Sequence, residues 1–213
     1  RFSLTYIGLF LILLSVLSFF NIIYSYYFNL YLNIDAYIYT LIISLFLGST
    51  FLIKKKIDSK ISIYIKILTV IIGYLVLPLI ISIPYYLSIY NISLIDCFFE
   101  AVSGFTSTGF TIFENIEHID ESLILWRSSS QWIGGIYFLF SIILLIDIFD
   151  DNLKKSLTNF ISFNSTEIFR QSSKILLLYS ALTLFLFIVL KLINIRTFDS
   201  FNLSMTIISS GGF

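Results

Sequence analysis

The sequence has few charged residues: 13 basic and 13 acidic side chains make up only 12% of its 213 residues. A soluble domain carries about 25% charged residues, so this deficit excludes an ordinary water-soluble fold and indicates a membrane protein. The net charge is zero, so nothing favours nucleic acid as a partner. The single cysteine, Cys97, excludes an intrachain disulfide, and the scarcity of His and Cys excludes a zinc-type cluster. We therefore expect no cofactor.

Long uncharged runs take up most of the chain, which is 58% hydrophobic and 18% aromatic. A helix needs about 17 to 25 mostly apolar residues to cross a bilayer. Five runs predict transmembrane helices: residues 2–34 with the helix ending in the twenties, 36–53, 67–95 with the helix exit near Pro84, about 126–146, and about 174–190. The predicted fold class is an all-α membrane protein.

Residues 96–110, with the sequence DCFFEAVSGFTSTGF, differ from these spans. The stretch is too short to cross a bilayer and too rich in small hydroxyl residues to face lipid. Non-helical backbone at membrane depth is tolerated only where it is buried in protein or lines a wet cavity. The stretch therefore predicts a re-entrant pore loop, with a half-helix at about 94–105 followed by backbone that faces an ion path.

The basic residues predict how the chain is oriented, because Lys and Arg accumulate on the cytoplasmic side. We take the side of Lys54, Lys55 and Lys56 as cytoplasmic and treat 96–110 as re-entrant. Ten basic residues then lie inside and three outside: Arg1, Lys54, Lys55, Lys56, Lys60, Lys66, Lys154, Lys155, Arg170 and Lys174 against Arg127, Lys191 and Arg196. A full span at 96–110 would move four of the ten outside. The N-terminus is predicted to be cytoplasmic, and the pore loops are predicted to enter from outside.

The last fifteen residues, 199–213, align with 96–110 without a gap at a spacing of 103 residues. The five identities are Asp96 with Asp199, Phe98 with Phe201, Ser107 with Ser210, Gly109 with Gly212, and Phe110 with Phe213. Parallel repeats around an axis along the membrane normal are a known way to build a transport pathway. We predict an N-terminal helix pair at 1–60, a first helix–pore loop–helix repeat at 61–150, and a second repeat at 151–213 that reaches its filter.

The end of each loop has the chemistry of a cation filter. Rings of backbone carbonyls replace the water shell of an ion in selective channels, and glycine reaches the unusual backbone angles that this requires. The carbonyl end of a helix carries a partial negative charge that favours a cation. The residues expected to line the ion path are Thr106, Ser107, Thr108, Gly109, Ser209, Ser210, Gly211 and Gly212. Asp96 and Asp199 lie at the opposite ends of the half-helices and are expected to cap them.

Some features near the loops allow two interpretations. Glu100 either pairs with a buried cation such as Arg127 or faces the pore vestibule, because a lone intramembrane charge is costly. Residues 134–135, a Gly-Gly pair, either let helices approach closely or form a gating hinge. The acidic loop at 114–121 is either an ordinary solvated loop or a means of concentrating cations. A helix-packing motif is an alternative for 96–110, although its glycines lack GxxxG spacing.

Three segments in this order, DCFFEAVSGFTSTGF, WRSSSQWIGGI and TIISSGGF, resemble the Trk/Ktr/HKT potassium transporter superfamily, in particular its TrkH-type subunits. The resemblance covers about residues 61–213 and includes LPLIIS at 77–82. It implies four helix–pore loop–helix repeats in one chain around a potassium path, with Gly109 and Gly212 as the first two filter glycines. It also implies an extra N-terminal helix pair, a homodimer in the lipid bilayer of a bacterial inner membrane, and a cytosolic TrkA-type nucleotide-binding regulatory subunit.

The resemblance favours potassium transport without an enzymatic step. Because the sequence contains two of four expected filters, we expect an N-terminal half that does not conduct potassium alone. A secondary transporter with re-entrant loops for another cation such as sodium is the first alternative. An intramembrane enzyme would need a nucleophile and base at membrane depth, and the pattern offers none. A purely structural membrane subunit leaves the two equally spaced loops unexplained.

Overall fold

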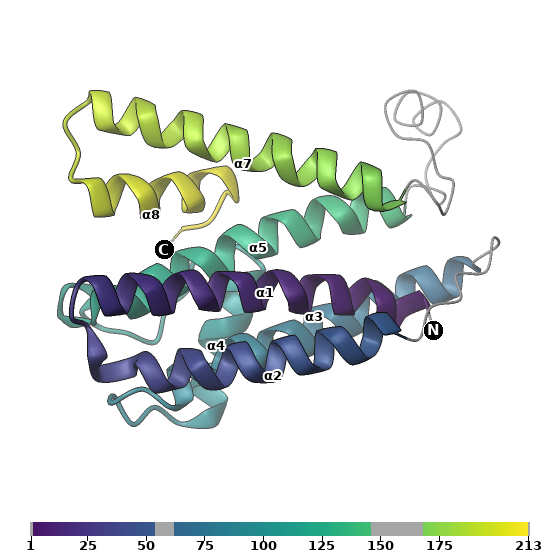
Figure 1. Cartoon of the computed structure of the whole chain (residues 1–213), viewed down its shortest axis with the longest axis horizontal. Helices are drawn as coiled ribbons and strands as arrows, with labels where there is room; N and C mark the ends of the chain where they lie inside the picture. The colour runs from purple at the N-terminus through teal and green to yellow at the C-terminus, as the bar shows by residue number, and fades with distance from the viewer. Residues whose placement is uncertain (1, 54–61, 146–167, 213) are drawn as a thin grey trace.

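A computed structural model describes residues 2–53, 62–145 and 168–212, which form helices joined by short loops and no strands (Figure 1). The helices are α1 (Phe2–Tyr27), α2 (Ile34–Ile53), α3 (Ile63–Tyr86), α4 (Leu94–Phe105), α5 (Glu121–Leu145), α7 (Ile168–Leu192) and α8 (Thr197–Ile208). Two short 3₁₀ turns, η1 (Tyr31–Asn33) and η2 (Ile116–His118), lie in the connections. The predicted all-α fold class is confirmed.

Within the described residues, five helical segments are long and apolar enough to cross a membrane: Leu4–Tyr27, Tyr31–Ile53, Ile63–Tyr86, Glu121–Leu145 and Ser173–Leu192. They correspond to the five predicted spans. The fourth begins at Glu121, five residues earlier than predicted, because its first turns carry polar residues that are buried inside the protein instead of facing lipid. Ser122 and Arg127 are among them. Hydropathy alone therefore placed the start of this helix too late.

Close packing joins α1 to α2 and aromatic rings join α1 to α5. A Cβ atom added at Gly48 would lie only 3.1 Å from the Gly8 carbonyl oxygen, so the two backbones nearly touch. The rings of Phe10 and Tyr137 meet edge to face with centroids 4.8 Å apart, a favourable arrangement for aromatic pairs. The N-terminal pair therefore packs on the same core as the helices that hold the first loop.

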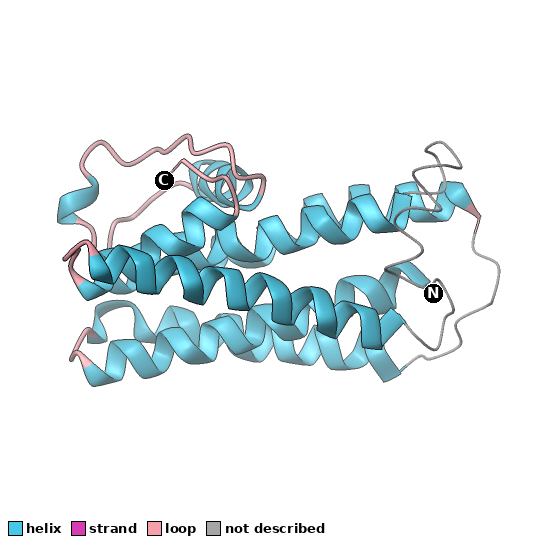
Figure 2. Cartoon of the chain, turned by 90° about the horizontal axis from the view of Figure 1, so that it is seen from above, coloured by secondary structure: helices cyan, strands magenta, loops and turns pink. Residues whose placement is uncertain are grey.

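The N-terminus of α5 is also tied to the first two helices by polar contacts. Tyr24 donates a hydrogen bond to Glu121 (3.1 Å), Asn33 donates one to Asp120 (3.0 Å), and the Tyr37 hydroxyl lies 3.0 Å from the Ser122 hydroxyl. Most of the loops gather at this end of the bundle, as Figure 2 shows. The end of the acidic loop is therefore hydrogen-bonded to the protein and is not simply solvated.

The domain division at residues 60 and 150 stays a prediction. Lys54, Lys55, Lys56, Lys60, Lys154 and Lys155, which carry much of the orientation argument, lie outside the described residues. The two short helices, α4 and α8, are each 12 residues long and are too short to span a bilayer. α4 packs on α3 and α5, and α8 packs on α7 and α5, so α5 lies between the two half-helices.

Candidate ion-binding site at two re-entrant loops

The first half-helix, α4, begins with a reciprocal cap. The Ser93 hydroxyl accepts a hydrogen bond from the Asp96 backbone N–H (3.2 Å) and donates one to the Asp96 carboxylate (2.7 Å). Asp96 also offsets the positive end of the helix dipole. The second half-helix has Asp199 in the corresponding turn, but its N-cap residue, Arg196, makes no side-chain cap. The capping role expected for the two aspartates is therefore complete only in the first repeat.

The two half-helices begin and end at equivalent positions, and equivalent hydrogen bonds close them. α4 and α8 begin and end 103 residues apart, which is the spacing of the sequence repeat. The closing bonds run from Ser107 N to Gly104 O (3.0 Å) and Thr108 N to Ser103 O (3.0 Å) in the first loop, and from Ser210 N to Ile207 O (3.0 Å) and Gly211 N to Thr206 O (2.8 Å) in the second. The repeat thus has a common backbone geometry.

A left-handed serine follows each half-helix. Ser107 and Ser210 both have φ of 56°, in a region that costs a non-glycine residue about 1–3 kcal/mol. Asn91 (φ 51°) and Asn194 (φ 66°), again 103 residues apart, have the same conformation before the half-helices. From the sequence, unusual backbone angles were expected only at glycines. The asparagine pair, which has the same 103-residue spacing, was a sequence signal that remained unused.

The two loops meet at their glycines. Gly109 has φ of 81°, and a Cβ atom added there would lie 2.8 Å from the Cα of Gly212. Residues 103 positions apart are therefore in backbone contact. Gly212 differs from Gly109 because its φ is not in the left-handed region, so the expectation of unusual angles holds only for Gly109. Gly212 serves the close approach of the two loops and not a special backbone angle.

Three hydroxyl groups of the loops are turned back onto the half-helices. Thr106 donates to the Val102 carbonyl (2.8 Å), Thr108 Oγ1 lies 3.1 Å from the Ser103 carbonyl oxygen, and Ser209 donates to the Thr206 carbonyl (3.0 Å). Ser209 is only 8% exposed, whereas the equivalent Thr106 is exposed. The proposed path residues thus lie together, but Ser209 faces protein.

A cavity of about 550 Å³ opens where the carbonyl ends of α4 and α8 converge. Both loops and three long helices line it: Tyr74, Phe105, Thr106, Ser107, Gly134, Gly135, Phe138, Leu139, Tyr179, Ile208, Ser209 and Ser210. Each helix end presents a partial negative charge, so a cation is the ion that this cavity favours. No groups of acidic, His or Cys side chains suited to a bound metal occur among the residues described.

One face of α5 touches both loops. A Cβ atom at Gly134 would lie 1.9 Å from the Phe105 carbonyl oxygen at the end of α4, and one at Gly135 would lie 3.0 Å from Ser209 Cβ. A Cβ atom at Gly211 would in turn lie 2.2 Å from Gln131 Oε1. The close-approach interpretation of the Gly-Gly pair therefore agrees with the structure. Gln131 was not singled out from the sequence.

A buried ion pair holds the chain that leaves the first loop. Arg127 Nε lies 2.8 Å from Glu100 Oε1, and the side chains are 2% and 0% exposed. Glu100 also accepts hydrogen bonds from the Ile112 N–H (2.9 Å) and the Thr111 hydroxyl (3.2 Å). Arg127 donates to the Thr111 hydroxyl (3.0 Å). Glu100 therefore pairs with Arg127 and does not face the vestibule, because isolated charges at this depth are too costly.

Ser103 adds one more attachment to the exit from the first loop, since its hydroxyl donates to the Phe110 carbonyl at 2.6 Å. Replacing Ser103 by alanine is expected to lower the free energy of unfolding by about 1 kcal/mol, the net value of one hydrogen bond. Thermal unfolding of the purified variant measures this. Ser204→Ala is the matched control, because Ser204 bonds only within its helix in the described structure (2.7 Å) and the first repeat has Ala101 there. Equal losses of stability in the two variants would contradict a role of Ser103 in holding the exit from the first loop.

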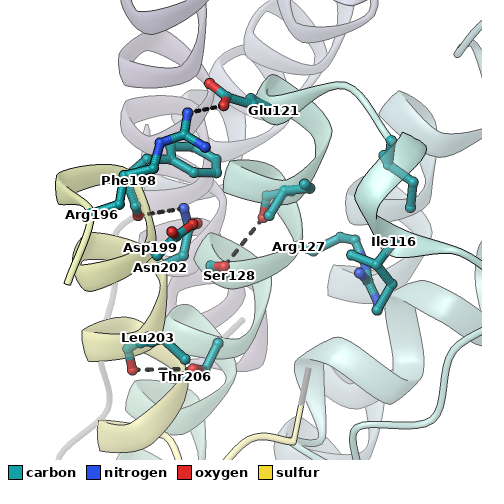
Figure 3. Close-up of a pocket in the computed structure, with 12 residues that line it drawn as sticks. Ile116, Glu121, Arg127, Ser128, Arg196, Phe198, Asp199, Asn202, Leu203 and Thr206 are labelled. Carbon is teal, nitrogen blue, oxygen red and sulfur yellow. Dashed lines mark hydrogen bonds and ion pairs between the residues drawn. The ribbon is translucent and has the colours of Figure 1, made fainter.

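A second cavity, of about 580 Å³, lies between α5 and α8 (Figure 3). An ion pair between Glu121 and Arg196 bridges the two helices at its rim. The Arg196 guanidinium lies 5.5 Å from the ring centre of Phe198. Arg127 also borders the cavity, but its side chain extends toward Ile116 and away from α8 (Figure 3). The cavity therefore separates the ion pair of the first loop from the second half-helix.

Comparison with known proteins finds similarity to cation transporters. No family model matches the chain. An uncharacterised cation transporter of Methanocaldococcus jannaschii is 31% identical over 150 residues, which cover 66% of this chain and 30% of that protein. The potassium uptake protein TrkI of Halomonas elongata is 46% identical over 55 residues, 26% of this chain and 11% of that protein.

The fold is that of a solved transporter. The crystal structure of the potassium transporter TrkH from Vibrio parahaemolyticus matches with a TM-score of 0.76 and 23% identity, over 100% of this chain and 44% of that chain. This chain thus spans less than half the length of the proteins it resembles. These homologues are transporters and not enzymes, which agrees with the predicted absence of an enzymatic step. The resemblance found in the sequence is confirmed.

Proposed function

We propose that this chain, a homologue of Trk potassium uptake proteins with the fold of TrkH, contributes two filter segments to a potassium path across a membrane. The observation that carries the proposal is the backbone contact between Gly109 and Gly212, which brings two copies of one loop to the same point. Two re-entrant loops that meet through glycine are the arrangement that a shared filter needs. A purely structural membrane subunit does not require this arrangement.

Selection of the ion follows from which oxygens remain available. The Thr106 and Ser209 hydroxyls donate to helix carbonyls and are therefore held against the half-helices, and backbone oxygens of the loops are the ligands that replace the ion's water shell. The converging carbonyl ends of α4 and α8 stabilise the dehydrated cation. The membrane potential then draws it inward with about 2.3 kcal/mol per charge per 100 mV. No covalent chemistry is required.

We also propose the setting of this path. The charge distribution supports a cytoplasmic N-terminus and loops that enter from outside, and the resemblance supports a bacterial inner membrane. The resemblance supports a homodimer and a cytosolic TrkA-type regulatory subunit. Four loops are expected around the path, and this chain, which covers 44% of the TrkH chain, has two of them. The activity therefore belongs to the full product of the gene.

The test is rescue of a strain that lacks its own potassium uptake systems. The full product of the gene is expected to restore growth at low potassium and to take up Rb⁺ as a potassium tracer. A parallel measurement of Na⁺ uptake addresses the second candidate, a sodium transporter. Uptake of Na⁺ with no Rb⁺ uptake would replace the potassium assignment, and uptake of neither ion by protein present in the membrane would refute both.

A further inference from the structure

Gln131 of α5 is buried without a hydrogen-bond partner in the part of the chain that the structure describes. Its side chain is 0% exposed, and neither Nε2 nor Oε1 has a hydrogen-bond partner among the described residues. Leaving such a group unsatisfied costs about 1–3 kcal/mol, so buried amides are almost always bonded to protein or to ordered water. The position of Gln131 therefore calls for a partner nearby.

The nearest candidate is the second filter loop. A Cβ atom added at Gly211 would lie 2.2 Å from Gln131 Oε1 and 2.7 Å from Nε2. The amide thus occupies the space that a side chain at position 211 would fill. The backbone of Gly211 is not in the left-handed region, so the backbone angles leave other residues possible there. It is the amide of Gln131 that keeps position 211 free of a side chain.

The first loop fills the same space differently. Its equivalent of Gly211, 103 residues earlier, is Thr108. The Thr108 hydroxyl lies 3.1 Å from the Ser103 carbonyl oxygen and 2.8 Å from the Thr106 hydroxyl. The first loop therefore carries its own polar group at this position, while the second loop has glycine and an amide from the neighbouring helix.

We propose that Gln131 is a positioning residue for the second filter, supplying from α5 the polar group that Thr108 supplies within the first. An amide has two N–H donors and one acceptor, so Gln131 can hold backbone groups of the second loop beside Gly211, directly or through one buried water. Fixing the backbone at Gly211 sets the orientation of the neighbouring filter carbonyls. The inference rests on the proposed function and adds a determinant of its ion selectivity.

The test exchanges the two arrangements in the full product of the gene. Gln131→Ala is expected to lower the ratio of Rb⁺ to Na⁺ uptake by about three- to tenfold, the loss of one net hydrogen bond. Gly211→Thr is expected to lower it as well, because the new side chain overlaps the amide. The double variant recreates the first loop and is expected to return the ratio to within about twofold of the parent, since neighbouring residues do not act additively.

Three further measurements decide between the outcomes. Membrane levels of each variant separate selectivity from expression, and Thr40→Val is the control, since its buried hydroxyl bonds the Ala36 carbonyl within α2 (2.8 Å). Thermal unfolding of the parent, the two single variants and the double variant gives a second double-mutant cycle, which does not depend on transport. The inference would be overturned if the double variant had an uptake ratio and a thermal stability no higher than those of the worse single variant. An unchanged uptake ratio in Gln131→Ala would also overturn it. A parent protein without Rb⁺ uptake would contradict the proposed function only.

Discussion

Replacing Gly109 by alanine or serine is expected to reduce Rb⁺ uptake strongly and to lower selectivity over Na⁺ by about tenfold or more. Gly109 has φ of 81°, where a residue with a Cβ atom pays about 1–2 kcal/mol, and that cost alone approaches a factor of ten. The added Cβ atom would also lie 2.8 Å from Gly212 Cα, a backbone atom that cannot rotate away. The second loop must then move. Competitive uptake of Rb⁺ and Na⁺ in the rescue strain measures the effect.

Gly212→Ala is the matched control, because the two glycines are equivalent in sequence but not in geometry. A Cβ atom at Gly212 would lie 3.6 Å from Gly109 Cα, which is ordinary contact, and its backbone is not left-handed. We therefore expect a much smaller loss of uptake. Equal damage from both substitutions, with equal amounts of protein in the membrane, would show that the described asymmetry has no role.

Removing either partner of the Glu100–Arg127 pair is expected to destabilise the protein by about 3–5 kcal/mol, because the remaining charge is left buried and unpaired. Both side chains are at most 2% exposed. Glu100→Ala also removes the acceptor for Ile112 N–H and the Thr111 hydroxyl, so the exit from the first loop is freed. The expected result is little folded protein in the membrane. Folded yield and thermal unfolding in detergent measure this.

A second ion pair provides the comparison. Arg196 and Glu121 are 63% and 32% exposed, so water screens their attraction. Arg196→Ala is expected to leave folded yield and the unfolding temperature close to those of the parent. If Arg127→Ala lost less folded yield and unfolding temperature than Arg196→Ala, burial would not decide how much these pairs stabilise the protein.

The spans and the first half-helix were predictable because they depend on composition along a continuous segment. The predicted half-helix at about 94–105 coincides with α4 (Leu94–Phe105). The pairing of Glu100 with Arg127 was one of two sequence interpretations, and the cost of burying a lone charge decides between them. Such inferences need only local pattern and solvation.

Contacts between distant segments were not predictable from one sequence. Gln131 and Gly211 are 80 residues apart, and nothing in either neighbourhood indicates that an amide takes the place of a side chain. No sequence pattern marks Thr111, although it bonds both members of the ion pair. Left-handed serines at 107 and 210 also went unrecognised, because serine has no intrinsic preference for that conformation.

The face of α5 that bears Gln131, Gly134 and Gly135 has a consequence for how such chains diverge. Because one helix touches both loops, a substitution on that face alters the fit of two segments that are far apart in the sequence. A bulkier residue at position 134 is tolerable only if the end of α4 moves, and a side chain at position 211 is tolerable only if position 131 becomes smaller. Related sequences should therefore change at positions 131 and 211 together, and the helix should evolve more slowly than the lipid-facing surface around it.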